Sequence, residues 1–574
     1  MVNTSPEEFE RGRAAILVRV AALVLAAIGC AFFAAGRLPS ERLRAIVLTS
    51  LSAQEAGLLT PELCSRIVLG LLSLAVASIL LAIGLFWAAV PAGEILAEFW
   101  SHLKQLRRHV AGGLVAFWIC DRVHAVELGA LTLWAVVLRC FFLSGPIRYD
   151  EAYTYLRYAS KPIYIGAAYY SANNHILNTV LMHFSALLFG SSPWALRLPT
   201  VMAAVLLVPL SYAAMRLCRG SDVGLLTAAL VSPSFPLIEY ATNARGYTLG
   251  TFFLLLTIVL AKIGEELPVA LILAGFAAAF ALYSVPTMAY GVAGVFLWVA
   301  FSTHSVRLLA RLVLPTAVLT VLLYAPVLAA VRVSKIAGNP WVAPLPFRQL
   351  WAETPFAISS LWQYWNMRVP AVLAILFVAA ALASAVYGVW RRSPPILLWA
   401  VIGSAVLVLI ERVDPPRRVW LFLVPLYLGA AADGLHHVLS RLPRNSVAVS
   451  AVALAVSAWM GVEVLRAGPL YRPGGEDHMF HNAEEYGFPN AAAFVREFRD
   501  HLAHGDTVVS SNPYNITIEY EIRRQGVPYR PSPSGERLIV TVPGTAPEVG
   551  PAPFEVIRKV ASYQYADVYL AGKP

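Results

Sequence analysis

Long apolar runs separated by short polar segments fill the chain up to about residue 465. A helix needs roughly 20 mostly apolar residues to cross a bilayer, and about thirteen stretches reach or approach that length. They lie at 13–36, 65–92, 125–145, 194–217, 222–240, 246–264, 267–283, 286–302, 312–331, 369–389, 395–411, 418–436 and 446–465. The pattern predicts an α-helical polytopic membrane protein.

The chain changes character at about residue 466, where charge rises and apolar runs shorten to strand length. The segments NAAAFVREFRDHL and ITIEYEIRRQGV are typical of helices, the second ending at Gly526, whereas DTVVSS and RLIVTV are typical of buried strands. This alternation predicts a small α/β domain over 466–574. We therefore expect an N-terminal extension (1–112) with two spans, a membrane domain (113–465) with outer loops 146–193 and 332–368, and this soluble domain.

Composition supports the membrane assignment: 58% of residues are hydrophobic, 14% are charged, and the mean hydropathy is +0.65. These values exclude a single soluble domain and a disordered scaffold. The net charge of +10 comes from basic clusters between apolar runs, which is typical of a positive-inside membrane protein and predicts no nucleic-acid partner. The five cysteines form no CxxC pair, so they indicate neither a zinc site nor a disulfide framework.

The basic clusters also predict topology. With the N-terminus in the cytoplasm, every inside loop is basic, and the C-terminal domain lies on the outer side of the membrane. The segment 93–112 has helical spacing and a basic end, which predicts an amphipathic helix on the cytoplasmic face. The apolar segment 177–189 is laid along the outer surface, because a crossing there would put the later basic clusters outside.

Candidate chemistry lies at the predicted outer ends of helices. The segment RYDEAYTYLRYAS places Asp150 and Glu151 at the outer end of a helix. The two carboxylates either have a functional role or are simply the acidic start of an interfacial helix. Later outer turns carry Arg245 and the pair Arg417 and Arg418. Arginine outside runs against the positive-inside tendency, so these side chains either hold a phosphate or pair with carboxylates: Glu239, Glu411 or Asp414.

The order of four segments resembles the GT-C superfamily of membrane glycosyltransferases, especially the bacterial family related to protein O-mannosyltransferases and the lipid A aminoarabinose transferase. The segments are DEAY, then NNHILNTVLMHFSALLFG leading into SPWALRLPT, then ATNARGYTLG, then PPRRVWLFLVPLYL. The resemblance covers about 125–465, and the mixed C-terminal domain suits that family. One departure concerns the acceptor pocket: relatives often have a His-Pro-Pro segment where this chain has Asn174, His175, Ile176 and Leu177.

The resemblance implies transfer of a sugar from a polyprenyl-phosphate donor to a lipid, glycan or protein acceptor at the outer face. It assigns Asp150 as general base and Glu151 as a group that orients the acceptor or tunes its neighbour. The donor phosphate would be held by Arg245, Arg417, Arg418 and Lys161. Tyr153, Asn174 and His175 would line the acceptor side of the cavity.

A divalent cation is a possible cofactor, with Asp150, Glu151 and His175 as ligands, because some GT-C enzymes employ one and others do not. His478 and His481, beside Glu476 and Asp477, form a second conceivable metal site, for which a solvated loop is the favoured interpretation. The alternative functions are a transporter or lipid flippase and a non-enzymatic envelope assembly protein. Transporters place ionisable groups near mid-membrane and show repeated halves, and this chain shows neither pattern.

Overall fold

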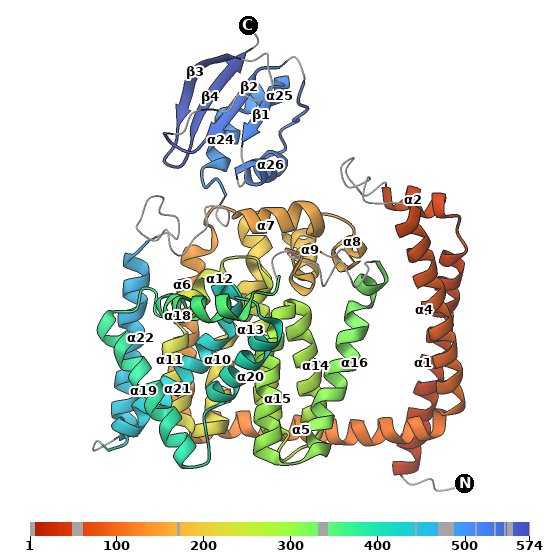
Figure 1. Cartoon of the computed structure of the whole chain (residues 1–574). Helices are drawn as coiled ribbons and strands as arrows, with labels where there is room; N and C mark the ends of the chain where they lie inside the picture. Colours follow the sequence, from red (N-terminus) through yellow and green to blue (C-terminus); the bar gives the residue numbers. More distant parts are fainter. Residues whose placement is uncertain are drawn as a thin grey trace.

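The structure, a computed structural model, describes residues 6–48, 61–168, 171, 173–330, 343–441, 445–468, 487–510, 514–532, 535–544, 547 and 555–572. It consists of a bundle of apolar helices with a small domain of mixed helices and strands at one end (Figure 1). The predicted fold class, a helical polytopic membrane protein with a C-terminal α/β domain, is confirmed.

The N-terminal part is a helical hairpin joined to the bundle by one long helix. Helices α1 and α4 pack against each other, and α5 runs across the end of the bundle toward α6 (Figure 1). Leu106 of α5 packs against Val269 and Ala270 of α14. The helices of this part are α1 (Pro6–Gly36), α2 (Ser40–Leu48), α4 (Pro61–Trp87) and α5 (Ala89–Cys120). Helix α5 contains the predicted amphipathic segment and is longer than predicted.

The main bundle supplies most of the membrane-spanning helices. Its elements are α6 (Arg122–Leu143), α10 (Pro193–Arg219), α11 (Ser221–Val231), α12 (Phe235–Ala241), α13 (Gly246–Ile263), α14 (Val269–Ser284), η2 (Pro286–Met288), α15 (Ala289–Thr303), α16 (Val306–Ala330), α19 (Ala371–Trp390), α20 (Ile396–Glu411), η4 (Arg417–Phe422), α21 (Leu423–Leu439) and α22 (Asn445–Arg466). Within the described ranges ten helices are long and apolar enough to cross a membrane, and α11 with α12, bent by 62°, makes an eleventh. The shorter α14 and α20 account for the two remaining predicted spans.

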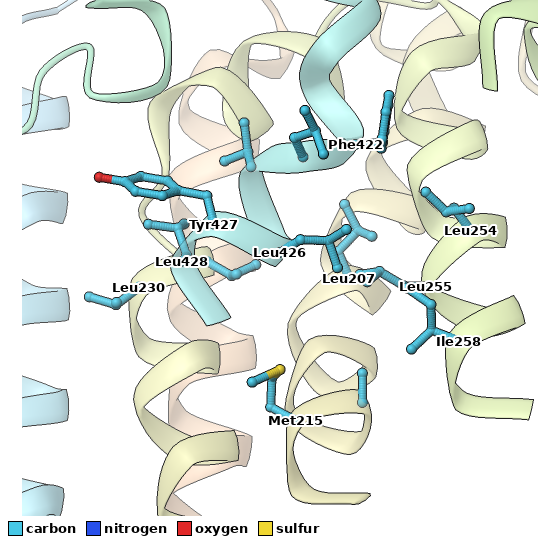
Figure 2. Close-up of a cluster of buried hydrophobic side chains, with 14 of the residues drawn as sticks. Leu207, Met215, Leu230, Leu254, Leu255, Ile258, Phe422, Leu426, Tyr427 and Leu428 are labelled. Carbon is cyan, nitrogen blue, oxygen red and sulfur yellow. The ribbon is translucent and has the colours of Figure 1, made fainter. Parts of the chain in front are cut away.

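The core of the bundle is built around α21, most of which is buried. Leu426 of α21 points toward Leu207 of α10 and Leu255 of α13 across this core (Figure 2). Helices α15 and α20 cross very closely, because a Cβ at Gly294 would lie 2.4 Å from the Cα of Ala400. Small residues at a crossing allow such close backbone approach between membrane helices.

Short helices collect at the end of the bundle that carries Asp150, which we call the Asp150 end. They are α7 (Tyr149–Thr154), the π-helical turn η1 (Tyr155–Ala159), α8 (Ile163–Ala168), α9 (Ile176–Phe189) and α18 (Phe347–Trp365). Helix α9 has 14 residues, fewer than a crossing needs, and packs against α10, η1 and α8. Figure 1 shows α7, α8 and α9 together at the top of the bundle, beneath the C-terminal domain.

The C-terminal domain contains a four-stranded sheet in the order β1-β2-β4-β3. Strand β1 pairs with β2 in parallel, with Thr507 opposite Arg537, whereas β4 runs antiparallel to β2 and β3. The elements are α24 (Ala491–Glu497), α25 (Arg499–His504), β1 (Thr507–Ser510), α26 (Tyr514–Arg524), β2 (Arg537–Thr541), β3 (Glu555–Ser562) and β4 (Asp567–Gly572). Phe494, Ile518 and Leu538 form its core.

Candidate active site

Glu151 is buried, and its hydrogen bonds hold together the segments that form the site. Its carboxylate accepts hydrogen bonds from the backbone N–H of Arg148 (2.9 Å) and of Ala244 (2.8 Å). Arg197 of α10 adds a two-pronged ion pair, with Nε and Nη2 each 2.7 Å from one carboxylate oxygen. The Arg148 contact forms a capping box that starts α7. Glu151 therefore joins α7, α10 and the turn before Arg245.

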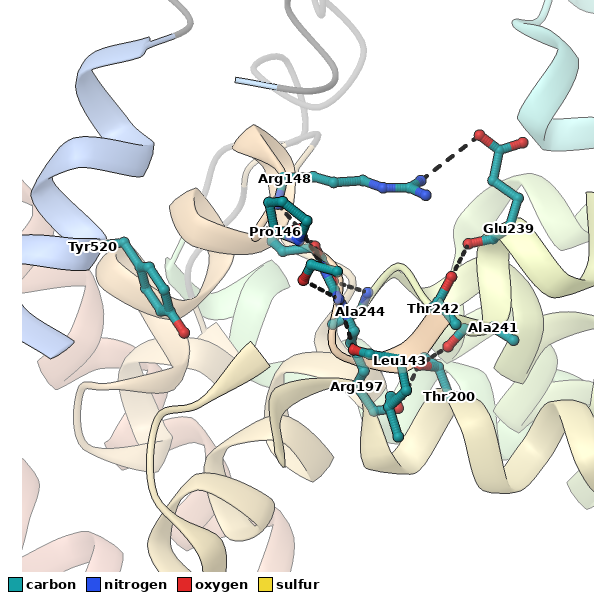
Figure 3. Close-up of polar contacts among 12 residues, drawn as sticks. Leu143, Pro146, Arg148, Arg197, Thr200, Glu239, Ala241, Thr242, Ala244 and Tyr520 are labelled. Carbon is teal, nitrogen blue, oxygen red and sulfur yellow. Dashed lines mark hydrogen bonds and ion pairs between the residues drawn. The ribbon is translucent and has the colours of Figure 1, made fainter. Parts of the chain in front are cut away.

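Arg197 extends this set of hydrogen bonds to the end of α6. Its guanidinium also donates to the carbonyl oxygens of Leu143 (2.8 Å), Gly145 (2.7 Å) and Pro146 (2.7 Å), as Figure 3 shows for this region. Both Arg197 and Glu151 are almost completely buried. The sequence interpretation did not single out Arg197, although an arginine inside an otherwise apolar span is itself a signal.

The structure argues against one of the two roles expected of Glu151, that of orienting the acceptor. Both of its oxygens are committed to protein donors, which hold α7, α10 and the turn before Arg245 together. Burial raises the pKa of Glu151, but Arg197, Arg148 and the Ala244 N–H together hold that pKa below its ordinary value. The carboxylate therefore stays ionised opposite Arg197.

Asp150 points in a different direction from its neighbour, because successive residues of a helix are turned by about 100°. Its side chain is 18% exposed, and its Oδ2 lies 3.5 Å from Nη2 of Arg245. Asp150 is thus the accessible member of the carboxylate pair, and a guanidinium stands beside it.

Arg245 is almost fully buried and sits between Asp150 and the segment before α9. It donates to the carbonyl oxygen of Asn173 (3.0 Å) and to the Oδ1 of the same residue. Its Nη2 is 3.4 Å from Nε2 of His175, and its Nε has no hydrogen-bond partner among the described residues. The expected pairing with Glu239 is not found, since Glu239 faces Arg148 at 3.7 Å (Figure 3).

The contact between His175 and Gly246 fixes the orientation of the imidazole. Nδ1 of His175 accepts the backbone N–H of Gly246 at 2.9 Å. A Cβ at Gly246 would lie 3.0 Å from the Cβ of His175 and 2.3 Å from the carbonyl oxygen of Ser284, so only glycine fits here. Burial, with the charges of Arg245 and Arg418, holds the pKa of His175 well below its usual value.

The neutral imidazole has one proton, and its position follows from that hydrogen bond. Because Nδ1 accepts, the proton is on Nε2. The Nε2–H of His175 and the Nη2 of Arg245 are then two buried donors that face each other. Such an arrangement leaves a place for a shared acceptor atom, of the kind that a phosphate oxygen provides.

A second cation lies near His175. Nε of Arg418, in η4, donates to the hydroxyl of Tyr247 at 3.1 Å. The Tyr247 ring packs edge-on against His175, with 4.9 Å between the ring centroids. Residues from three separate segments, around 175, 245 and 418, therefore meet at the Asp150 end. Arg417 precedes Arg418 in the same short helix.

The remaining predicted site residues have other surroundings. Asn174 is committed to the protein, because its amide donates to the carbonyl oxygen of Gly166 (2.8 Å) and accepts from Thr179 (2.8 Å). It joins α8 to α9, which corrects the expectation that it lines the cavity. Tyr153 lies between the rings of Tyr149 and Tyr158, each at a centroid distance of 6.0 Å. Lys161 is partly exposed in the turn after η1.

The C-terminal domain rests on the same group of helices. Tyr520 of α26 packs edge-on against Tyr155, with centroids 5.8 Å apart, and its hydroxyl donates to the carbonyl oxygen of Ser191. Arg157 of η1 forms an ion pair with Glu519 at 3.2 Å. The helix that carries Asp150 is thus covered by α26.

The metal site expected from Asp150, Glu151 and His175 does not fit this geometry. Arg197 and two N–H groups occupy the Glu151 carboxylate, and Nδ1 of His175 accepts a backbone N–H. In the part of the chain that the structure describes, the one cluster of three metal-ligating side chains is His501, Asp506 and Glu536 of the C-terminal domain. The second predicted site, Glu476, Asp477, His478 and His481, lies outside the described residues.

Three solved structures of two proteins have a similar course of the chain. ArnT from Cupriavidus metallidurans in the apo state is 12% identical, with a TM-score of 0.49 over 80% of this chain and 98% of that chain. The same protein bound to undecaprenyl phosphate is 13% identical, with a TM-score of 0.47 over 78% and 97%. AglB from Archaeoglobus fulgidus, with an inhibitory peptide and a dolichol-phosphate, is 13% identical, with a TM-score of 0.42 over 70% and 64%.

The sequence comparison is more local. No curated protein matches the chain at a significant level. Residues 176–329 match the family described as dolichyl-phosphate-mannose-protein mannosyltransferase. This segment includes α9, Arg197, Arg245 and Gly246, so it holds much of the site described above. Over residues 176–329 the match agrees with the expected resemblance to the GT-C superfamily of membrane glycosyltransferases, in the branch related to protein O-mannosyltransferases.

Proposed function

We propose that the protein transfers a sugar from a polyprenyl-phosphate-linked donor to a lipid, glycan or protein acceptor at the outer face of a bacterial plasma membrane. The observation that carries the proposal is the 3.5 Å contact between Asp150 and Arg245. It places an accessible carboxylate directly beside a buried cation that faces a second donor, His175. Transfer from a phosphate carrier needs both groups close together.

The base acts on the acceptor. As the acceptor oxygen or nitrogen attacks the anomeric carbon, Asp150 takes its proton, and the bond between that carbon and the phosphate oxygen breaks. General-base assistance of this kind is worth roughly a hundred- to ten-thousand-fold in rate. The acceptor thus needs one free oxygen of Asp150.

The cations act on the leaving group. Negative charge grows on the phosphate as the glycosidic bond breaks, and donors fixed in a poorly hydrated site stabilise it better than water does. Arg245 and the Nε2–H of His175 hold one phosphate oxygen between them, and Arg418 holds another. Arg417 and Lys161 give further charge around the phosphate. His175 therefore belongs to the donor side of the cavity rather than to the acceptor side, and Tyr153 remains on the acceptor side.

The ion pair also suggests an order of events. Without donor, Nη2 of Arg245 lies 3.5 Å from Oδ2 of Asp150 and engages that carboxylate oxygen. A bound phosphate competes for the same guanidinium, so its arrival frees Asp150 to accept a proton. Donor binding thus activates the base, and an acceptor that arrives first finds the base occupied.

Replacement of Asp150 tests the central assignment. We expect Asp150→Asn to retain donor binding and to lose at least about a hundredfold in transfer rate, measured in proteoliposomes with radiolabelled polyprenyl-phosphate sugars. Glu265→Gln is a matched control, since Glu265 lies after α13, at the opposite end of the bundle, and pairs only locally with Lys262. Arg245→Met should instead weaken donor binding. Wild-type turnover by Asp150→Asn would remove the proposal.

A further inference from the structure

A second polar cavity lies at the end of the bundle opposite Asp150. It has a volume of about 440 Å³ and opens between the C-terminal ends of α10, α19 and α21. Its lining includes Arg219, Tyr387, Arg391, Ser393, Asp433 and His437. Helix α10 runs from the active site to this cavity, and its residues Arg197 and Arg219 are 22 residues and therefore about 33 Å apart along the helix.

The acidic group in this cavity is already neutralised. Asp433 is buried, accepts a hydrogen bond from Ser384 at 2.6 Å, and lies 3.7 Å from Nε of Arg219. Nη1 of Arg219 donates to Oγ of Ser393 at 3.0 Å, and Nη2 donates to the carbonyl oxygen of Ser393 at 2.5 Å. Arg219 and Asp433 therefore form a closed internal pair, and they leave the other side chains to set the charge of the cavity.

One group in the lining, Arg391, retains unused donors. Arg391 lies over the rings of Trp390 (5.0 Å) and Tyr387 (5.4 Å), and its Nε donates to the Tyr387 hydroxyl at 3.1 Å. Its two terminal nitrogens have no hydrogen-bond partner among the described residues. His437 donates its Nδ1–H to the carbonyl oxygen of Asp433 at 2.7 Å, which leaves Nε2 toward the cavity. The remaining charge is positive.

The rim of the cavity is apolar and faces outward. Leu217, Val386 and Trp390 are exposed to 41%, 71% and 72%. In a helix bundle of this kind such surfaces contact lipid, and a tryptophan is typical of the membrane interface. A ligand with a charged head and an apolar tail can therefore reach the cavity from the bilayer.

We propose that this cavity binds the phosphate headgroup of an anionic phospholipid in the leaflet at that end of the bundle. The planar fork of Arg391 matches two phosphate oxygens. The acyl chains follow the apolar surface of α19 past Val386 and Trp390. Basic pockets between membrane helices recognise phospholipid headgroups by this chemistry.

The test uses the full-length protein purified in nonionic detergent and measures its thermal stability while lipid is added. We expect phosphatidylglycerol to raise the Tm and phosphatidylcholine to leave it unchanged. Arg391→Gln should weaken the apparent affinity for phosphatidylglycerol about fivefold. Arg392→Gln is the matched control, because Arg392 is adjacent, exposed and equally charged but does not line the cavity.

Three results would overturn the proposal. Equal stabilisation by phosphatidylcholine would show that headgroup charge is irrelevant, and an equal effect of Arg392→Gln would show that only general surface charge matters. Equal stabilisation by inorganic phosphate would identify a site for a soluble anion. Arg391→Lys keeps the charge without the fork and should lie between wild type and Arg391→Gln. Because the readout is binding, the result is independent of transfer, and Asp150→Asn should bind this lipid normally.

Discussion

Glu151→Gln is the sharpest test of the division of labour between the two adjacent carboxylates. Glu151 accepts four hydrogen bonds of 2.7–2.9 Å, two from Arg197 and two from backbone N–H groups. A glutamine keeps one oxygen but presents an NH₂ to the other donors, and it leaves the buried charge of Arg197 without a counter-ion. Breaking a buried pair in this way costs about 3–5 kcal/mol. We expect that loss in the free energy of unfolding.

The measurement is a reversible denaturant titration in mixed micelles, with Asp150→Asn as the matched control. Asp150 is partly exposed and has a single 3.5 Å ion contact, so its replacement should cost no more than about 1 kcal/mol. The two variants should therefore differ in kind. Glu151→Gln loses stability, whereas Asp150→Asn loses transfer activity but remains folded.

A double variant shows whether the charge itself is responsible. Glu151→Gln combined with Arg197→Met removes both members of the pair and should recover part of the lost stability. Recovery stays incomplete, because the carbonyl oxygens of Leu143, Gly145 and Pro146 lose their donor. If the free energy of unfolding of Glu151→Gln is within about 1 kcal/mol of the wild-type value, the assignment of Glu151 as a scaffold residue is wrong.

Two further predictions follow from the same geometry. Because the folded state lowers the pKa of Glu151, its stabilising contribution is complete above the ordinary value of 4.5 and disappears as the pH falls toward the folded-state pKa. Denaturant titrations below pH 4.5 should show this loss in wild type, and an equal loss in Glu151→Gln would contradict it. Gly246→Ala should displace His175 and reduce transfer about a hundredfold, whereas Gly112→Ala, with open space around it, should be neutral; kinetic assay of both variants in proteoliposomes decides this.

The lengths of apolar runs were sufficient to predict the spans, because a membrane helix depends on local composition. The bend between α11 and α12 was missed although Pro233 lies at the break, and a proline commonly kinks or ends a helix. The strands β3 and β4 were missed because they lack a clear alternation of apolar and polar residues. The placement of α9 outside the set of spans came from charge rather than from apolar character, and its 14 residues agree with that placement.

The site was harder to predict, because neighbours in sequence have unrelated environments. Asp150 and Glu151 look equivalent in the chain, and only the position of Arg197, 46 residues later, decides which one is buried. The proton position on His175 likewise depends on Gly246, 71 residues away. Asn174 shows the opposite case. It is a polar residue that lies beside candidate site residues, and its hydrogen bonds join α8 to α9.

The contact between η1 and α26 has a consequence for biosynthesis. Glu519 is made 362 positions after Arg157, which at ribosomal speeds of 5–20 residues per second is roughly 20–70 s later. Throughout that interval Tyr155 and Arg157 lack their contacts with α26, even though the helix that carries Asp150 has already been made. This surface of the nascent chain therefore stays incomplete until α26 emerges. A premature stop before α26 would leave the bundle without the helix that covers η1.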